Sequence, residues 1–477
     1  MEWFWGNLMF FLFTIVILFA FVNCVSLWFL VNNLLVHILL APLQNERAVG
    51  MVSGTLEAKN VCWDNVFRLD CCIFAEKKLQ KYHNMKKNLF VLMMCLACAF
   101  GVQADDEIVF TTVLENPITS VKNQNRSGTC WDYATIGFVE AELLRKTGKV
   151  YDLSEMFVAN KDYVDCAEYH VRMHGNSRFS EGGSADDVFE VIDRHGICPE
   201  EAMARPGSMI GDTLANFTEF FTTLEPYVES IAKGNSTKLT TQWKVGLQGI
   251  LDAYLGICPE AFTYEGKHYT PKSFAQMLGI NKKDYVSITS FTHHPFYEEF
   301  VIEAPYKWRP RPSWNVTLNE MMATIDTALR YGYTVCWGGD VSEDGFTRTG
   351  LGIAADIEHA PDLTGSDAAR WLKLTKQEKA ESLKKMGAHT PELVPSQELR
   401  QERFDNWQST YDHVMLIFGI ARDQNGREYY MVKNSWGKTG DYNGIWYMSK
   451  AYIALNTTYI FLNKDAVKKD VRKKLGF

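Results

Sequence analysis

The 477-residue sequence lacks the features that mark several classes of protein. Charged residues are 22% and hydrophobic residues 47% of the chain, a balance that excludes disordered, collagen-like and coiled-coil proteins. The net charge of −8 does not favour a nucleic-acid partner, because proteins bind nucleic acids through clustered positive charge. Eleven cysteines are too sparse for a disulfide scaffold. The composition therefore indicates an ordinary globular protein.

Charge is missing altogether from one stretch, which runs from Trp3 to Asn45. The apolar residues between Trp3 and Leu43 are numerous enough to span a membrane. The net charge is +2 before residue 104 and −10 after it, and six of the eleven cysteines precede it. The first hundred residues are therefore expected to be a different kind of polypeptide from the rest.

A second apolar segment has the layout of a secretory signal peptide. It begins at Met85 with two lysines, continues through twelve apolar residues and ends in small residues up to Ala104. We therefore expect the exported protein to start at Met85, with 1–84 as an upstream extension of the reading frame. A membrane anchor between Trp3 and Leu43 is the alternative. The predicted parts are the extension (1–84), the signal peptide (85–104) and the mature chain (105–477).

The mature chain shows helical periodicity mainly in its first half and strand-like alternation mainly near its end. Helices are predicted at 131–147, 184–195 and 318–331, and in the polar stretch 367–403 with a connector near 391–396. Strands are predicted at 413–421, 429–433 and 445–448. This order predicts an α+β fold with segregated halves. No linker rich in proline, glycine or serine separates them, so one catalytic unit is expected.

Cys130 stands where a polar, glycine-containing loop runs into a predicted helix. A thiol at this place feels the positive end of the helix dipole and the unpaired amide donors, and both lower its pKa. Without that context, a packed core cysteine would be the better interpretation. Gln124 lies six residues earlier, and its amide can donate to an oxyanion together with the backbone N–H of Cys130.

A thiolate nucleophile needs a general base, and His413 is the best candidate because it opens a predicted strand that would hold it rigidly. The base needs an acceptor on its other ring nitrogen to fix the tautomer. Asn434 follows the next strand and offers an amide oxygen. Trp436 lies two residues further on and could shield that hydrogen bond from water.

Together these segments resemble the papain-like cysteine peptidases. The matching residues are Gln124, Gly128-Thr129-Cys130-Trp131, Asp412-His413, Gly419 and Lys433-Asn434-Ser435-Trp436-Gly437. The resemblance implies a helical half carrying the nucleophile helix and a β-barrel-like half carrying His413 and Asn434. It also implies that Gly182 and Gly183 hold the substrate backbone, that Trp131 supports the site, and that the enzyme needs no metal or organic cofactor.

Departures from the family pattern indicate one branch. Ser127 replaces a cysteine that forms a disulfide in many members, and the cysteine expected just before Gly182 is also absent. The gap between Cys130 and His413 is 283 residues, against about 130–150 in papain, so an insertion is expected at roughly 200–320. Only 25 residues separate Ala104 from Cys130, too few for an inhibitory propeptide. These features resemble the bleomycin hydrolase and aminopeptidase C branch.

In that branch the C-terminal tail lies in the cleft and restricts the enzyme to free N-termini, and the subunits form hexameric rings. The last segment here, 463–477, carries six basic residues, five of them between 468 and 474. A solvated basic helix end is the alternative to a tail in the cleft. A homo-oligomer is therefore possible but not assigned.

The predicted function is a cysteine peptidase acting on peptides, most consistent with an aminopeptidase of bleomycin hydrolase type. An endopeptidase, an acyl transferase with the same triad and a non-catalytic peptide-binding protein are alternatives. The signal peptide predicts a secreted or bacterial periplasmic protein. A glycan at the Asn125 sequon would block the cleft, which favours a bacterial periplasm over a eukaryotic secretory route. Membrane attachment is expected only if 1–84 is present.

Overall fold

The computed structural model describes residues 108–477, apart from 212–213, 357–372, 376–377 and 379–389. The predicted extension (1–84) and signal peptide (85–104) lie outside the described residues. So does most of the polar stretch at 367–389. Within the described part of the chain, no helix is both long and apolar enough to cross a membrane.

Three helices form the helical half next to the cleft: α3 (Cys130–Thr147), α4 (Glu155–Arg172) and α5 (Ala185–His195). The helices predicted at 131–147 and 184–195 are confirmed to within one residue. Local signals set their ends. The Ser154 side chain caps α4, Ser184 and Asp187 form a capping box on α5, and α3 ends at Gly148 in the left-handed region.

The β-rich half is built on one mixed sheet of ten strands. Its pairing order is β10-β13-β12-β11-β9-β14-β6-β8-β7, and β1 pairs with β11 outside this path. The main strands are β1 (Thr111–Glu115), β6 (Tyr285–Thr289), β9 (Val335–Gly339), β11 (His413–Arg422), β12 (Glu428–Lys433), β13 (Ile445–Ser449) and β14 (Thr457–Asn463). The short strands are β7 (Glu299–Phe300), β8 (Ser313–Asn315) and β10 (Leu351–Gly352). All three predicted strands are present.

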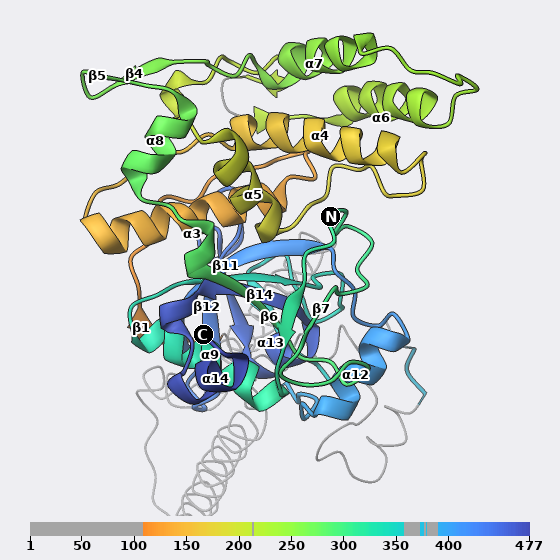
Figure 1. Ribbon diagram of the computed structural model, residues 1–477. Helices are drawn as coiled ribbons and strands as arrows, with labels where there is room; N and C mark the ends of the chain where they lie inside the picture. Colours follow the sequence, from red (N-terminus) through yellow and green to blue (C-terminus); the bar gives the residue numbers. More distant parts are fainter. Residues whose placement is uncertain (1–107, 212–213, 357–372, 376–377, 379–389) are drawn as a thin grey trace, which may run out of the picture. The chain divides into compact units, whose positions relative to one another are not determined.

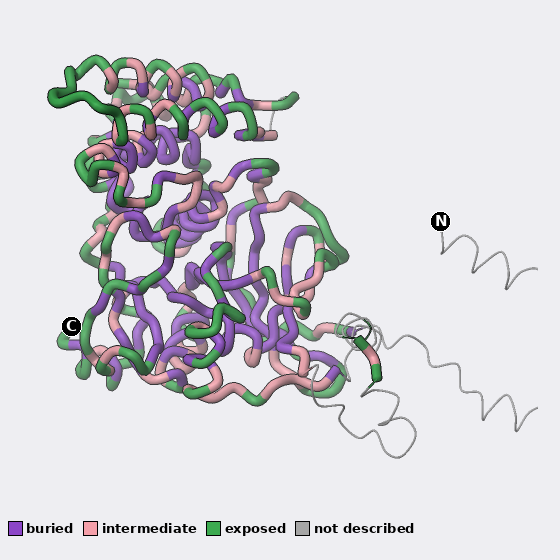
Figure 2. The backbone as a smooth tube through the Cα atoms, turned by 90° about the vertical axis from the view of Figure 1, so that its right-hand side faces the viewer, coloured by how far each residue is buried: buried purple, intermediate pink, exposed green. Residues whose placement is uncertain are grey.

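The central strand β11 reads as a continuous apolar run because both faces of the sheet are covered. Val414 and Leu416 pack in the core shared with α3, whereas Met415 and Ile417 pack in the core shared with α9 (Leu318–Arg330). Figure 1 shows α3 on one side of the sheet and α9 on the other. The buried residues gather in the strands and in the adjoining helices (Figure 2).

The region of the predicted insertion, 200–320, divides into two parts. Its first part forms α6 (Thr218–Ala232), α7 (Gln242–Leu255), the hairpin β4–β5 (Phe262–Tyr264 and Lys267–Tyr269) and α8 (Pro271–Leu278), with the small pair β2–β3 (Met209–Ile210 and Leu214–Ala215) before α6. Helices α6 and α7 share an apolar core with α4 and form the outermost layer (Figure 1). The second part supplies β6, β7 and β8 to the main sheet. The boundaries of the insertion stay a prediction.

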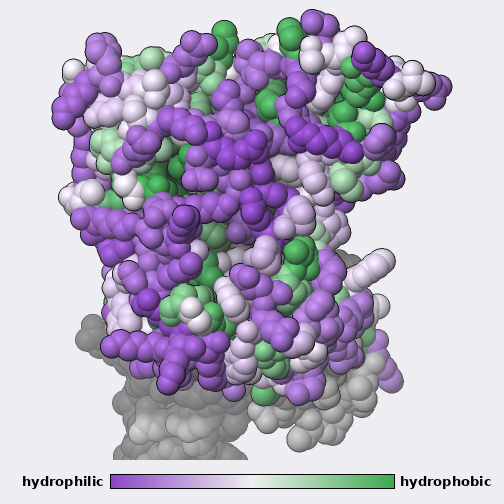
Figure 3. Space-filling model, in the orientation of Figure 1, coloured by the Kyte–Doolittle hydropathy of each residue, from purple (hydrophilic) through white to green (hydrophobic). Residues whose placement is uncertain are grey.

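The C-terminal segment packs against the far side of the sheet. It contains β14 and the short helix α14 (Lys469–Leu475). Helix α13 (Lys450–Asn456) directly precedes β14 and contacts α12 (Gln397–Asp405). Val471 and Leu475 are buried in the core that contains α9. Phe477 packs beside Trp314, with ring centroids 6.2 Å apart. The tail is therefore a basic helix end anchored by apolar contacts. Hydrophilic side chains prevail on the face shown in Figure 3, and hydrophobic ones form small separate patches.

Candidate active site

The N-terminus of α3 opens into a cleft of about 560 Å³ lined by both halves of the protein. Seven of the eight residues predicted from the sequence line this cleft: Gln124, Cys130, Trp131, Gly182, Gly183, His413 and Trp436. The eighth, Asn434, lies behind His413 and bonds to it. The structure therefore brings residues from four separate chain segments to one place.

Cys130 is the first residue of α3 and is half-buried. Its backbone N–H therefore belongs to the helical turn whose amides have no intrahelical partners. The preceding loop is held by hydroxyl groups. Ser127 Oγ donates to the carbonyl oxygen of Gln124 at 2.8 Å and shares a 2.5 Å hydrogen bond with Thr129 Oγ1. Ser127 thus stabilises the nucleophile loop at the position where a disulfide was expected to be lost.

His413 begins β11, and its ring is buried between Asn434 and Trp436. His413 Nε2 lies 2.9 Å from Asn434 Oδ1, and the Trp436 ring centroid is 5.0 Å from that of His413. Asn434 Oδ1 also accepts the backbone N–H of Ser435 at 2.8 Å. Because that N–H can only donate, the amide oxygen is the atom facing His413. The neutral imidazole therefore carries its proton on Nε2 and keeps Nδ1 as the basic nitrogen.

Burial dominates the proton affinities of both reacting groups. It raises the pKa of the Cys130 thiol to about 12, although backbone N–H groups of Val414 and Trp131 oppose the rise. It lowers the pKa of His413 to about 4, although the hydrogen bond to Asn434 opposes the fall. The predicted lowering of the thiol pKa by the helix N-terminus is therefore wrong for the thiol alone, because desolvation is the larger effect.

The two shifts together define how this site can ionise. A thiolate alone and an imidazolium alone are each disfavoured in the buried site. A thiolate–imidazolium pair has no net charge, and its members attract each other strongly in a medium of low dielectric. Ionisation of Cys130 is therefore coupled to proton uptake by His413.

Gln124 is fixed with its amide group toward the nucleophile loop. Ser435 Oγ donates to Gln124 Oε1 at 2.6 Å, and Gln124 Nε2 donates to the carbonyl oxygen of Ser127 at 2.6 Å. The backbone N–H of Gln124 also donates to the carbonyl of Ser435 at 2.8 Å. An amide nitrogen carries two hydrogens, so one N–H of Gln124 remains for a group in the cleft.

The Gly182–Gly183 segment forms the opposite wall, and large side chains are packed against it. A Cβ atom at Gly182 would lie 2.7 Å from Tyr306, and one at Gly183 would lie 2.8 Å from the Trp131 ring. Tyr411 donates its hydroxyl to the carbonyl of Gly183 at 2.6 Å. Both positions therefore need glycine, and the segment presents bare backbone to the cleft.

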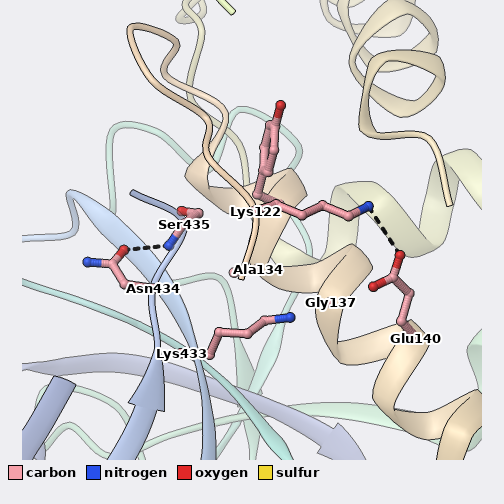
Figure 4. Close-up of a pocket in the computed structure, with 8 residues that line it drawn as sticks. Lys122, Ala134, Gly137, Glu140, Lys433, Asn434 and Ser435 are labelled. Carbon is pink, nitrogen blue, oxygen red and sulfur yellow. Dashed lines mark hydrogen bonds and ion pairs between the residues drawn. The ribbon is translucent and has the colours of Figure 1, made fainter. Parts of the chain in front are cut away.

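Behind α3, away from the cleft, lies a small buried cavity surrounded by charged side chains (Figure 4). Lys122 Nζ lies 3.2 Å from Glu140 and 2.8 Å from Glu155. Lys433 Nζ donates to Thr119 Oγ1 at 3.1 Å, and Thr119 in turn donates to Glu140 at 2.6 Å. The cavity volume of about 10 Å³ is close to what one water molecule needs. This network joins α3, the loop before Gln124 and the strand before Asn434.

Several residues that line the cleft were not found from the sequence. Glu181 and Tyr411 are next to recognised motifs, so their positions could have drawn attention to them. Phe221 and Glu225 come from α6, and Tyr306 comes from the loop after β7. Nothing in the local sequence of these three residues connects them with Cys130, because only the tertiary fold does.

One group of side chains within the described residues could hold a metal ion: His293, His294 and Glu303. It lies outside the cleft lining. Gln401 Oε1 accepts the backbone N–H of Thr292, so Gln401 Nε2 donates to His293 Nδ1 at 3.0 Å. This places the His293 proton on Nε2, 3.1 Å from Glu303. The arrangement is that of histidines hydrogen-bonded to a carboxylate. All five cysteines of the described chain are free thiols.

Comparisons with known proteins agree with this geometry. The family described as papain family cysteine protease matches residues 110–242, and the peptidase C1-like family matches residues 375–476. These ranges contain Cys130 and the His413–Asn434 pair respectively. The chain belongs to the papain-like cysteine peptidases, in the branch of the aminopeptidase C proteins.

The similarity to aminopeptidase C and to a solved structure extends along most of the chain, whereas the similarity to a cathepsin L-like protein covers a shorter part. Aminopeptidase C of Lactobacillus delbrueckii subsp. lactis is 21% identical over 74% of this chain and 81% of its own length. A cathepsin L-like protein of Caenorhabditis elegans is 35% identical over 23% of this chain and 29% of its own. The solved structure of pepw from Lactobacillus rhamnosis matches with a TM-score of 0.58 at 19% identity, over 77% of this chain and 84% of that one. The last likeness confirms the predicted α+β papain-like fold.

Proposed function

We propose that this protein is an aminopeptidase that hydrolyses peptide bonds through an acyl-enzyme on Cys130. One observation carries the chemistry: Asn434 fixes the proton of His413 on Nε2, so Nδ1 is the free base in the cleft that contains Cys130. The similarity to aminopeptidase C, over four fifths of that protein's length, supports the restriction to free N-termini.

In the first half of the reaction, His413 Nδ1 takes the proton of the Cys130 thiol as the sulfur attacks the scissile carbonyl carbon. The carbonyl oxygen becomes an oxyanion, which accepts hydrogen bonds from Gln124 Nε2 and the backbone N–H of Cys130. The tetrahedral intermediate collapses, and the C–N bond breaks. The imidazolium gives its proton to the leaving amine, so a thioester on Cys130 and a neutral His413 remain.

In the second half, His413 Nδ1 accepts a proton from water while the water oxygen attacks the thioester carbon. The same two donors hold the second oxyanion. The C–S bond then breaks, the sulfur recovers the proton from His413, and the carboxylic acid product leaves. Asn434 keeps the imidazole in one orientation throughout, because the Nε2–H bond to its Oδ1 persists in both protonation states.

The position of the tail favours a second candidate, an endopeptidase. The described residues after Trp436 include the whole C-terminal segment, and none of them lines the cleft. A cleft without the tail can admit the interior of a longer peptide.

One peptide made in two forms separates the candidates. A fluorogenic peptide with a free N-terminus and the same peptide with an acetylated N-terminus are offered to the purified protein, and Cys130→Ala serves as the blank. Cleavage of the free form alone supports an aminopeptidase. Equal cleavage of both forms supports an endopeptidase, and no cleavage above the blank contradicts the peptidase proposal.

A further inference from the structure

The cleft wall that carries Gly182 and Gly183 also carries two carboxylates without a counter-ion. Glu181 directly precedes the glycines, and Glu225 comes from α6. Among the described residues, no Lys, Arg or His nitrogen forms an ion pair with either carboxylate. Arg178 also lines the cleft, but its guanidinium lies 4.1 Å from the centre of the Tyr306 ring and its Nε donates to Ser180 Oγ at 3.4 Å, and it forms no ion pair with either carboxylate.

Glu181 is held firmly at its backbone. Its carbonyl oxygen accepts hydrogen bonds from Trp131 Nε1 at 2.9 Å and from the Tyr163 hydroxyl at 3.1 Å. Trp131 directly follows the nucleophile in α3. Any movement of Glu181 would therefore disturb the first turn of the nucleophile helix, and its position relative to Cys130 is fixed.

The side chain of Glu181 is fixed as well. Its Oε2 accepts the backbone N–H of Gly128, two residues before Cys130. A Cβ atom at Gly128 would lie 2.6 Å from the Cβ of Glu181, so the absence of a side chain there permits this close approach. The other oxygen, Oε1, has no partner among the described residues. One carboxylate oxygen thus faces the site beside the nucleophile loop without a donor.

The electrostatics of this wall favour a positively charged ligand. Burial raises the pKa of Glu181, the charge of Glu225 raises it further, and the N–H of Gly128 opposes both effects. Ionising a partly buried carboxylate near a second, exposed one is costly, and a cation bound beside them in the cleft relieves that cost.

We propose that Glu181, with Glu225 beside it, determines specificity by binding a cationic group of the substrate next to the scissile bond. The cation is either the ammonium of a free N-terminus or the ammonium or guanidinium of a basic side chain. This inference rests on the proposed peptidase function and assigns its substrate class. It places recognition in the cleft wall, because the C-terminal tail packs against the core of α9.

The test uses four fluorogenic amides: leucyl and lysyl, each with a free and an acetylated N-terminus. Acetyl-leucyl amide has no cation, and the other three have at least one. Glu181→Gln removes the charge but keeps an oxygen for the Gly128 N–H. We expect the ratio of kcat/KM for cationic over neutral substrates to fall about 10- to 100-fold in this variant, mainly through KM. Glu260→Gln, which changes an exposed carboxylate outside the cleft, serves as the matched control.

The substrates that lose their advantage identify the cation. A loss for free leucyl amide assigns the N-terminal ammonium, whereas a loss for acetyl-lysyl amide assigns the side chain. Either result supports the proposal. An unchanged ratio in an active Glu181→Gln enzyme overturns it while leaving the peptidase function intact. If the wild type cleaves none of the four above the Cys130→Ala blank, the peptidase function fails and this assignment fails with it.

A further readout separates recognition from a merely structural role. The rate at which iodoacetamide alkylates Cys130 reports whether the nucleophile loop is intact. We expect this rate in Glu181→Gln to stay within about twofold of the wild type, because the bond to Gly128 persists. Loss of alkylation together with an equal loss for all four substrates would show that Glu181 only supports the loop, and would overturn the proposal.

Discussion

The two sides of helix α3 use charge in opposite ways. At its N-terminus, Cys130 and His413 lie in a buried environment that disfavours a charge on either group alone. On its flank, Glu140 lies in a buried network with Lys122 and Lys433, where positive and negative side chains meet at hydrogen-bonding distance (Figure 4). The same helix therefore carries a neutral reactive end and an ionic structural side.

This difference in charge between the two sides explains how the site is both rigid and reactive. A permanent ion next to Cys130 would stabilise one protonation state and oppose the transfer of a proton to His413. The charged side chains of the ionic network instead lie outside the lining of the cleft that contains Cys130. There the network ties the loop of Gln124 and the strand before Asn434 to α3 without fixing a charge on the nucleophile.

The largest expected effect follows from removing the nucleophile at the neutral end. Cys130→Ala should lower kcat by about 10⁴-fold or more, because it removes the sulfur that forms the acyl-enzyme beside His413. Steady-state kinetics with a fluorogenic peptide measure this loss. Cys336→Ala, which removes a buried thiol outside the cleft lining, is the control. Residual turnover within tenfold of the wild type would contradict the assignment of Cys130.

Gln124→Glu replaces the donor of the oxyanion hole by a carboxylate of the same shape. The oxygen that accepts from Ser435 is retained, whereas the hydrogen bond from Nε2 to the Ser127 carbonyl is lost with the oxyanion donor. We expect kcat to fall by about 10²- to 10³-fold, since one oxyanion donor is lost and a negative charge is introduced. A kcat within threefold of the wild type would exclude Gln124 from the oxyanion hole.

Asn434→Ala tests the fixed tautomer of His413. Without the acceptor at Oδ1, the imidazole can place its proton on either nitrogen and can rotate. We expect kcat to fall about 10- to 100-fold, a loss typical of partners that orient a functional histidine. The matched control is Asn406→Ala, an exposed amide outside the cleft lining. Equal kinetics for the two variants would show that Asn434 does not orient the base.

The sequence predicted the residues on one side of α3 better than those on the other. The site residues Cys130, His413 and Asn434 were predicted because each residue type has a distinct chemical role. Each also lies at the start of a helix, at the start of a strand or just after a strand. The charged residues of the flank gave no such signal. A lone Lys122 or Glu140 in a sequence is indistinguishable from a surface charge.

The tertiary fold explains most of what the sequence did not predict. Phe221 and Glu225 reach the cleft because α6 packs on α4, a contact that the apolar spacing within each helix does not specify. The helix dipole favoured a lowered thiol pKa, but the depth of burial of Cys130 was not visible in the sequence. The structure reverses that expectation because desolvation depends on atoms from distant segments.

A substitution on the ionic side of α3 is expected to change the stability of the fold rather than the catalytic chemistry. Lys433→Met leaves the carbonyls of Thr119 and Ser120 without their donor and removes a positive charge near Glu140. We expect the free energy of unfolding to fall by about 2–3 kcal/mol, the usual cost of leaving buried polar groups unpaired. Denaturant titration measures it. The control is Lys438→Met, an exposed lysine five residues later. Equal midpoints for the two variants would contradict a structural role for Lys433.

The smallest expected effect is the change in Cys130 reactivity with pH. Because the pKa of His413 is lowered to about 4, the imidazole remains able to accept a proton from pH 7 down to pH 5. The rate of Cys130 alkylation by iodoacetamide should change less than about threefold over this range, whereas a histidine of ordinary pKa would reduce it by about 30-fold. Asp412, whose pKa is raised to about 6, adds a small opposite step, since its charge raises the pKa of the thiol. A steep fall of the alkylation rate with decreasing pH above pH 6 would contradict an uncharged pair of Cys130 thiol and His413 imidazole.

The central claim is that Cys130 carries the acyl group during turnover. The most direct measurement is mass spectrometry of the protein quenched in acid while it hydrolyses a reactive aminoacyl ester, with Cys130→Ala run in parallel. We predict a mass increase equal to one acyl group, located on the peptide that contains Cys130 and absent from the variant. Continued hydrolysis without any acyl group on Cys130 would contradict the claim.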